Sequence, residues 1–146
     1  MKLQLQFVLF FIIPALSFAQ CPTDAHIELN SQADVDSFIL DYPNCTSFTT
    51  GYNFIISGSD IIDLSPLSSL TYVKRITIEN NPLLTSLDGL DNLQSNSTDK
   101  TDLHIIDNPI LTDVSALQGL LACGNIDIIN NDQLTNLDGL SSITYM

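Results

Sequence analysis

The residues that could perform chemistry in this 146-residue chain are few and stand far apart. Two histidines, His26 and His104, are candidates for a general base or a metal ligand, and Cys123 is a candidate thiol nucleophile. Both histidines stand beside apolar residues that alternate with a period of two, so we expect each side chain to point outward from a strand. The G-x-S-x-G, H-E-x-x-H, C-x-x-C and phosphate-loop patterns that organise catalytic sites are absent from the sequence. We therefore predict a protein that is not an enzyme and has no cofactor, no catalytic residues and no metal site.

The acidic residues far outnumber the basic ones. Seventeen Asp and Glu stand against four Lys and Arg, which gives a formal net charge of −13. Most of the acids are single Asp residues in turn-like stretches, which is typical of a solvated surface; a calcium site is the alternative. The calcium-binding Gly-Gly-x-Gly-x-Asp repeat is absent, and Asp34 and Asp36 fall on the exposed side of an expected helix, so we predict no glycosidase pair.

A targeting segment is predicted over residues 1–19. Lys2 precedes an apolar run that ends in the small-x-small pattern "SFA" at Ala19, which is typical of a secretory signal peptide. The run is short for a membrane span, so we expect a secreted or cell-surface protein with no stable span after cleavage. A lipoprotein and an uncleaved anchor are the alternatives. Lipidation would require a small residue directly before Cys21, and Gln20 stands there.

Cleavage would leave few cations. Loss of Lys2 takes the net charge from −13 to −14, and the remaining cations are Lys74, Arg75 and Lys100. Such a chain has no basic surface to neutralise phosphates, so nucleic acid and anionic membrane surfaces are poor partners.

Three cysteines follow the predicted signal peptide. In an oxidising compartment Cys21 and Cys45 are the natural disulfide pair, because they bracket one small unit. Cys123 is left over, either as a buried free thiol or as half of a bridge to further sequence. A reactive thiol is the rival interpretation, and no His or Asn stands in a recognisable arrangement to activate it.

The strongest feature of the sequence is a phrase that occurs four times. The copies begin at Phe54, Ile76, Leu103 and Ile126, separated by 22, 27 and 23 residues. The long spacing is explained by a polar insert, Gln94–Lys100, which we expect to be an exposed loop. Each copy has six apolar residues at fixed positions. In the second copy these are Ile76, Ile78, Leu84, Leu87, Leu90 and Leu93.

The spacing within a copy predicts its path. The first two apolar positions alternate as in a short strand, and the later ones recur every third residue, as in a tight three-residue-per-turn path. Between them stand Asn and Asp residues that tolerate left-handed backbone angles and can bond local backbone groups. One copy buries too little to offset the conformational entropy that it loses, so the copies must stack, as in a solenoid.

The two ends of the repeat differ. Upstream, Ile27 and Leu29 predict a short strand, Ser31 and Asp34 resemble a helix capping box, and the apolar spacing from Val35 predicts an amphipathic helix that stops at Pro43. We expect residues 20–48 to form a helical cap clamped by Cys21–Cys45, and residues 49–146 to form the repeats. The phrase "LSSITYM" copies "LSSLTYV" and then stops, which predicts an open C-terminal end. A longer protein truncated here is the first hypothesis, and self-association is the alternative.

The combination of the phrase I-x-I-x-N-N-x-x-L-x-x-L-D-G-L with the preceding "SQADVDSFILDYPNC" resembles the receptor L-domain, especially in secreted proteins of Bacteroidetes-type bacteria. The resemblance covers Cys21 to the end and implies a mainly β fold, a right-handed single-stranded β-helix or leucine-rich-repeat-like solenoid whose sheets are used for binding. The cysteine-rich modules and kinase of the animal receptors are absent, so signalling is not implied. The family has no fixed ligand-contacting motif, so the resemblance assigns no site residue.

Function is then expected on the outward strand positions, which should form two rows. The first row is Ile55, Thr77, His104 and Asp127; the second is Ser57, Glu79, Ile106 and Ile129. The exposed isoleucines of the second row favour a contact patch; the alternative is that a second apolar layer or a neighbouring turn covers them. We predict a recognition or adhesion module for an extracellular protein or glycan. The alternative is the targeting module of a longer secreted enzyme with a catalytic domain beyond Met146.

Overall fold

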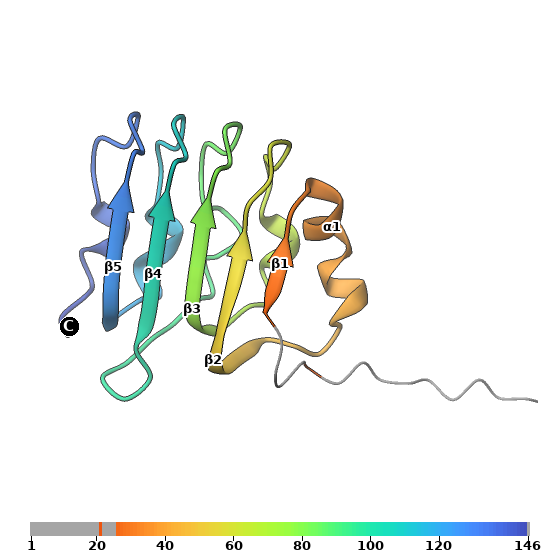
Figure 1. Cartoon of the computed structure of the whole chain (residues 1–146). Coiled ribbons are helices and arrows are strands. Elements are labelled where there is room, and N and C mark those ends of the chain that lie inside the picture. Colours follow the sequence, from red (N-terminus) through yellow and green to blue (C-terminus); the bar gives the residue numbers. More distant parts are fainter. Residues whose placement is uncertain (1–20, 22–25, 146) are drawn as a thin grey trace, which may run out of the picture.

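The described residues fold around one parallel β-sheet with a single α-helix at one end (Figure 1). The structure is a computed structural model that describes residue 21 and residues 26–145, with the backbone alone for residues 50–52. The predicted signal peptide, residues 1–19, lies outside the described residues. The elements are β1 (Ile27–Leu29), α1 (Gln32–Asp41), β2 (Ser47–Ile56), β3 (Tyr72–Glu79), β4 (Thr101–Ile106) and β5 (Cys123–Ile129). The order of the strands in the sheet, β1-β2-β3-β4-β5, follows the sequence.

The four copies lie side by side in one register. The first apolar residue of each copy is opposite the next, in the order Phe54, Ile76, Leu103 and Ile126, and their neighbours two residues on are paired in the same way. In the first three copies all six apolar positions are buried, as the spacing predicts. In the fourth copy most are only partly buried and Leu137 is exposed, because no described strand lies beyond β5.

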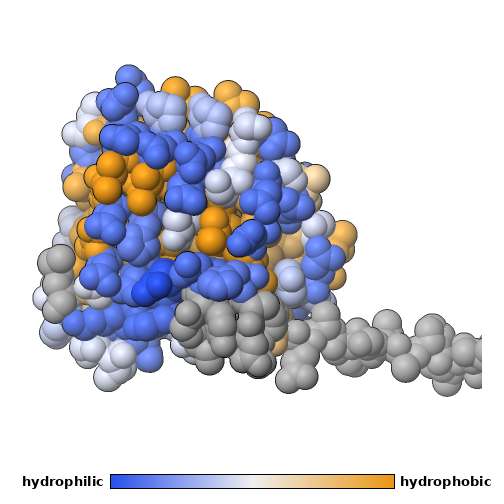
Figure 2. All heavy atoms as spheres, viewed as in Figure 1, coloured by the Kyte–Doolittle hydropathy of each residue, from blue (hydrophilic) through white to orange (hydrophobic). Residues whose placement is uncertain are grey.

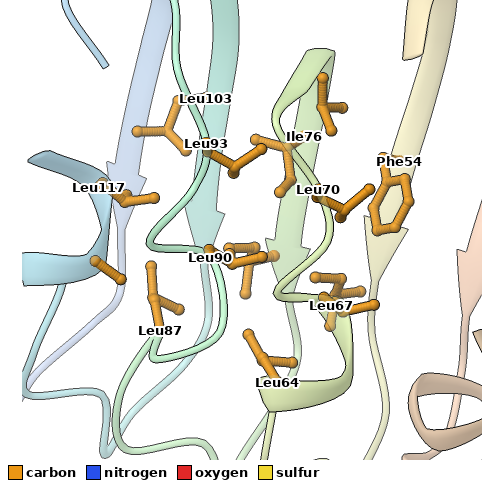
Figure 3. Close-up of a cluster of buried hydrophobic side chains, with 14 of the residues drawn as sticks. Phe54, Leu64, Leu67, Leu70, Ile76, Leu87, Leu90, Leu93, Leu103 and Leu117 are labelled. Atoms are coloured by element: carbon orange, nitrogen blue, oxygen red, sulfur yellow. The ribbon is translucent and has the colours of Figure 1, made fainter. Parts of the chain in front are cut away.

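The segments that join the strands run along the back of the sheet. Two of them contain short 3-10 helices, η1 (Ser65–Leu67) and η2 (Ser115–Gly119), and a third, η3 (Asp138–Leu140), follows β5, which agrees with the three-residue period. Their leucines point toward the strands and fill the core (Figure 3). Each copy begins this segment with the same cap, in which one side chain accepts a hydrogen bond from the backbone N–H two residues on. The acceptors are Asp63, Ser86, Asp113 and Asn136.

An asparagine ladder joins the bends that follow the strands. Asn80, Asp107 and Asn130 have left-handed φ angles of 56°, 56° and 54°, which confirms the predicted bend in three copies. The next residue in two of these copies, Asn81 and Asn108, is fully buried.

The ladder bonds run between copies. The Asn81 Nδ2 donates to the Ile56 oxygen and to Asn108 Oδ1, both at 3.0 Å. The Asn108 Nδ2 donates to the Ile78 oxygen at 3.0 Å, and the Asn108 backbone N–H donates to Asn131 Oδ1 at 3.1 Å. The sequence predicted local bonds, and the structure uses these side chains to tie each copy to its neighbours.

One glycine lies where two copies approach each other closely and the backbone takes a left-handed angle. Gly89 has a φ of +106°, and a Cβ atom placed there would collide with the backbone oxygen of Leu64 in the preceding copy. A side chain at this position would therefore both strain the backbone and push two copies apart.

The N-terminal unit has the predicted strand, helix and disulfide. Ser31 caps α1 by accepting from the Asp34 backbone N–H at 3.2 Å, and Cys21 is bonded to Cys45. The Phe38 ring packs against the Phe54 ring with 5.5 Å between centroids, which joins the helix to the core of the sheet. The apolar spacing from Val35 also placed Ile39 on the inner face of the helix, and this prediction was wrong: Ile39 is 47% exposed, since the helix turns this side away from the sheet.

The ladder can be tested by removing one amide. Replacement of Asn108 by Ala would leave the buried Asn81 backbone N–H without its partner and would remove the amide bonds to Asn81 Nδ2 and to the Ile78 oxygen, so we expect the free energy of unfolding to fall by about 3 kcal/mol. Asn92→Ala is the matched control, because its exposed amide makes one bond, to the Ser68 oxygen at 2.8 Å, and should cost less than about 1 kcal/mol. Urea unfolding followed by circular dichroism measures both, and equal losses would contradict a structural role of the ladder.

Candidate functional site

The outer face of the sheet carries the two predicted rows in register. Ile55, Thr77, His104 and Asp127 are opposite one another across β2 to β5, and so are Glu79, Ile106 and Ile129 across β3 to β5. Ser57 follows the end of β2 and donates its backbone N–H to the Leu29 oxygen at 2.9 Å. Parallel pairing thus brings side chains that are more than twenty residues apart in sequence into two adjacent lines.

His104 and Asp127 form a polar pair in the first row. The distance from His104 Nδ1 to Asp127 Oδ2 is 2.7 Å, and the histidine side chain is the less exposed of the two. The carboxylate fixes the orientation of the ring, which is how a general base is often held. Thr77, the next residue in the row, makes no side-chain hydrogen bond within the described part of the chain, so it is not bonded to this pair.

The second row ends in an apolar patch, which we define as Ile106 and Ile129. Ile129 is 48% exposed and Ile106 is partly buried, and no further layer of the described residues covers them. Figure 2 shows this face as mainly hydrophilic, with an apolar group near the ends of β4 and β5. The patch is bordered by Glu79 in its own row and by the His104–Asp127 pair in the other.

A third row, not predicted from the sequence, lies nearer the start of the strands. Asn53, Arg75 and Asp102 are opposite one another in β2, β3 and β4. The Arg75 guanidinium contacts Asp102 Oδ2 at 3.3 Å and Asn53 Oδ1 at 3.4 Å. The Asn125 backbone N–H donates to Asp102 Oδ1 at 3.1 Å. The sequence could have predicted this row, because Arg75 and Asp102 stand two positions before Thr77 and His104 and so lie on the same face of their strands.

Asp102 is the most buried charge of this face. It is 8% exposed, and the partly exposed Arg75 side chain balances its charge while Asn125 fills the other carboxylate oxygen. A buried carboxylate with these partners is satisfied, so it stabilises the β-bulge between β4 and β5 instead of offering a free acid.

Cys123 is a buried free thiol, one of the two states that the sequence allowed. Burial, and secondarily the charge of Asp102, raises the pKa of the Cys123 thiol above its ordinary value. The neutral thiol is a poor nucleophile and a poor metal ligand, which disfavours the reactive interpretation.

Acidic side chains in the turns accept hydrogen bonds from nearby backbone N–H groups. Hydrogen bonds from Ser65 lower the pKa of the Asp63 carboxyl, and bonds from Ser115 lower the pKa of Asp113 in the equivalent place. Within residues 21 and 26–145 no group of three or more His, Cys, Asp or Glu side chains is close enough to hold a metal ion.

Comparisons with models of protein families, with curated proteins and with solved structures give no match to this chain. Among the described helices, none is both long and apolar enough to cross a membrane. Function must therefore be argued from the geometry of the outer face itself.

The state of Cys123 can be tested with a thiol reagent. We expect the folded protein to resist alkylation by iodoacetamide at neutral pH, since the thiol is buried and its pKa is raised, and to react once per molecule in urea. Mass spectrometry counts the modified thiols. Rapid alkylation of the native protein at neutral pH would restore the reactive interpretation.

Proposed function

We propose that the protein is a secreted or cell-surface recognition module without enzymatic activity, which binds an extracellular protein or glycan through the outer face of its sheet. The observation that carries this proposal is the Ile106–Ile129 patch, an apolar pair on the sheet of which Ile129 is exposed and Ile106 partly buried, bordered by Glu79 and by the oriented His104–Asp127 pair. A small apolar centre with a polar rim is the usual anatomy of a protein interface.

The proposed fold is a right-handed single-stranded β-helix, a leucine-rich-repeat-like solenoid of the receptor L-domain type. The sequential parallel strands, their common register and the asparagine ladder support it. In such a fold the repeated apolar and Asn positions belong to the scaffold. Recognition then depends on the outward side chains, which differ from copy to copy.

Two features support an extracellular site of action. The Cys21–Cys45 disulfide is stable in oxidising compartments and rare in reducing ones. The apolar run at the start of the sequence has the pattern of a secretory signal peptide. The large negative charge keeps such a protein dispersed and directs it to partners other than polyanions.

The proposal is tested by charging the patch. We expect the double variant Ile106→Lys with Ile129→Lys to weaken binding by more than about tenfold, because two desolvated contacts are replaced by solvated charges. The purified protein is screened on arrays of extracellular proteins and of glycans, and hits are measured by surface plasmon resonance.

The matched control is Ile62→Lys with Leu83→Lys, which charges two exposed apolar residues outside the strands. Circular dichroism and thermal melting establish that both variants are folded. Equal loss of binding in the control, or unfolding of the patch variant, would refute the assignment of the patch as the contact surface.

A further inference from the structure

A hollow of about 670 Å³ lies away from the outer-face rows, beside the polar insert between β3 and β4. Figure 1 shows this insert as a loop that hangs below the start of β4. We define the insert groove by Tyr72, Gln94, Asn96, Asp99 and Leu121, with threonine and serine side chains between them. We propose that the insert groove binds a neutral saccharide.

The insert is the one part of the repeat that the scaffold does not require. It lengthens the spacing between copies from 22 or 23 residues to 27, yet β3 and β4 keep the register of the other pairs. A polar loop that leaves the packing unchanged is a common place for a binding function.

The groove is formed in the absence of a ligand. The Asn96 Oδ1 accepts from the Thr98 backbone N–H at 2.9 Å and from the Asp99 N–H at 3.0 Å, so the loop folds on itself. Its end is fixed where the Lys100 oxygen accepts from the Tyr72 hydroxyl at 3.2 Å and from the Lys74 Nζ at 3.0 Å. Walls held in this way lose little conformational entropy when a ligand binds.

The lining combines the two kinds of group that a sugar ring requires. The partly buried Tyr72 ring and the Leu121 side chain, which is 47% exposed, offer apolar surface for the C–H face of a pyranose. The Gln94 amide and the Ser47 hydroxyl make no hydrogen bonds within the described residues, and both can donate to and accept from sugar hydroxyls.

Charge argues for a neutral ligand. Asp99 is the acid among the described lining residues, and its carboxylate accepts from Asn96 Nδ2 at 3.3 Å and from Thr98 Oγ1 at 3.2 Å. The net charge of −13 repels anions, while a single engaged carboxylate gives a cationic peptide little to bind.

The experiment is an NMR titration of the whole chain with a panel of neutral oligosaccharides built from glucose, galactose, mannose and N-acetylglucosamine. The protein is made in a host without N-glycosylation, because Asn96-Ser97-Thr98 is a sequon within the insert. We expect at least one panel member, at millimolar concentration, to shift the backbone amides of Tyr72, the insert and Leu121.

Two conservative truncations test the contacts. Gln94→Ala and Leu121→Ala should each raise the Kd of that oligosaccharide by about tenfold, whereas Gln133→Ala and Leu83→Ala, which truncate exposed side chains of the same types that do not line the groove, should leave it unchanged. A panel that shifts none of the groove amides, or truncations with no effect, would overturn the saccharide site. Shifts confined to the strand residues of the outer face would also overturn it while supporting the outer-face proposal, so the two sites are judged separately.

Discussion

The asparagine ladder is the constraint on which the rest of the molecule depends. A buried amide and the buried backbone groups around it must all find partners, and Asn81 and Asn108 satisfy these groups only when the neighbouring copy lies in one register. A shift by one residue would leave several polar groups in the core without hydrogen-bond partners and would turn the apolar side of the strand outward. The ladder therefore adds a second constraint, besides the packing of the apolar side chains, on the spacing and alignment of the copies.

This constraint separates scaffold from surface. Inward positions are filled by similar apolar residues in every copy, and the bends of three copies use Asn or Asp, while the outward positions hold residues as different as Ile55, Thr77, His104 and Asp127. The outward side chains make few demands on the core. They can differ without cost to the fold, and the chemistry that distinguishes this chain is concentrated there and in the insert.

Much of this arrangement follows from the sequence, because the buried residues recur at regular intervals along the chain. Strand alternation, the three-residue path, the capped helix and the Cys21–Cys45 pair were all predictable from local spacing. Bonds between copies were not, since the sequence does not tell whether an Asn side chain turns to its own backbone or to a neighbour. The Arg75–Asp102 row was missed because each copy was taken to start at its first apolar residue. The insert groove depends on how the loop of the insert folds back, and the regular spacing of apolar residues does not determine the conformation of that loop.

The even strand spacing of the outer face has a consequence for what can be recognised there. Neighbouring parallel strands lie about 4.8 Å apart, so the side chains of each row are spaced at this interval across the sheet. Under the proposed function, an extended partner that crosses the strands would contact one side chain of a row in each copy, so the number of copies would set the length of partner that the face can bind. One additional copy would lengthen each row by one side chain and leave the positions of the other side chains unchanged.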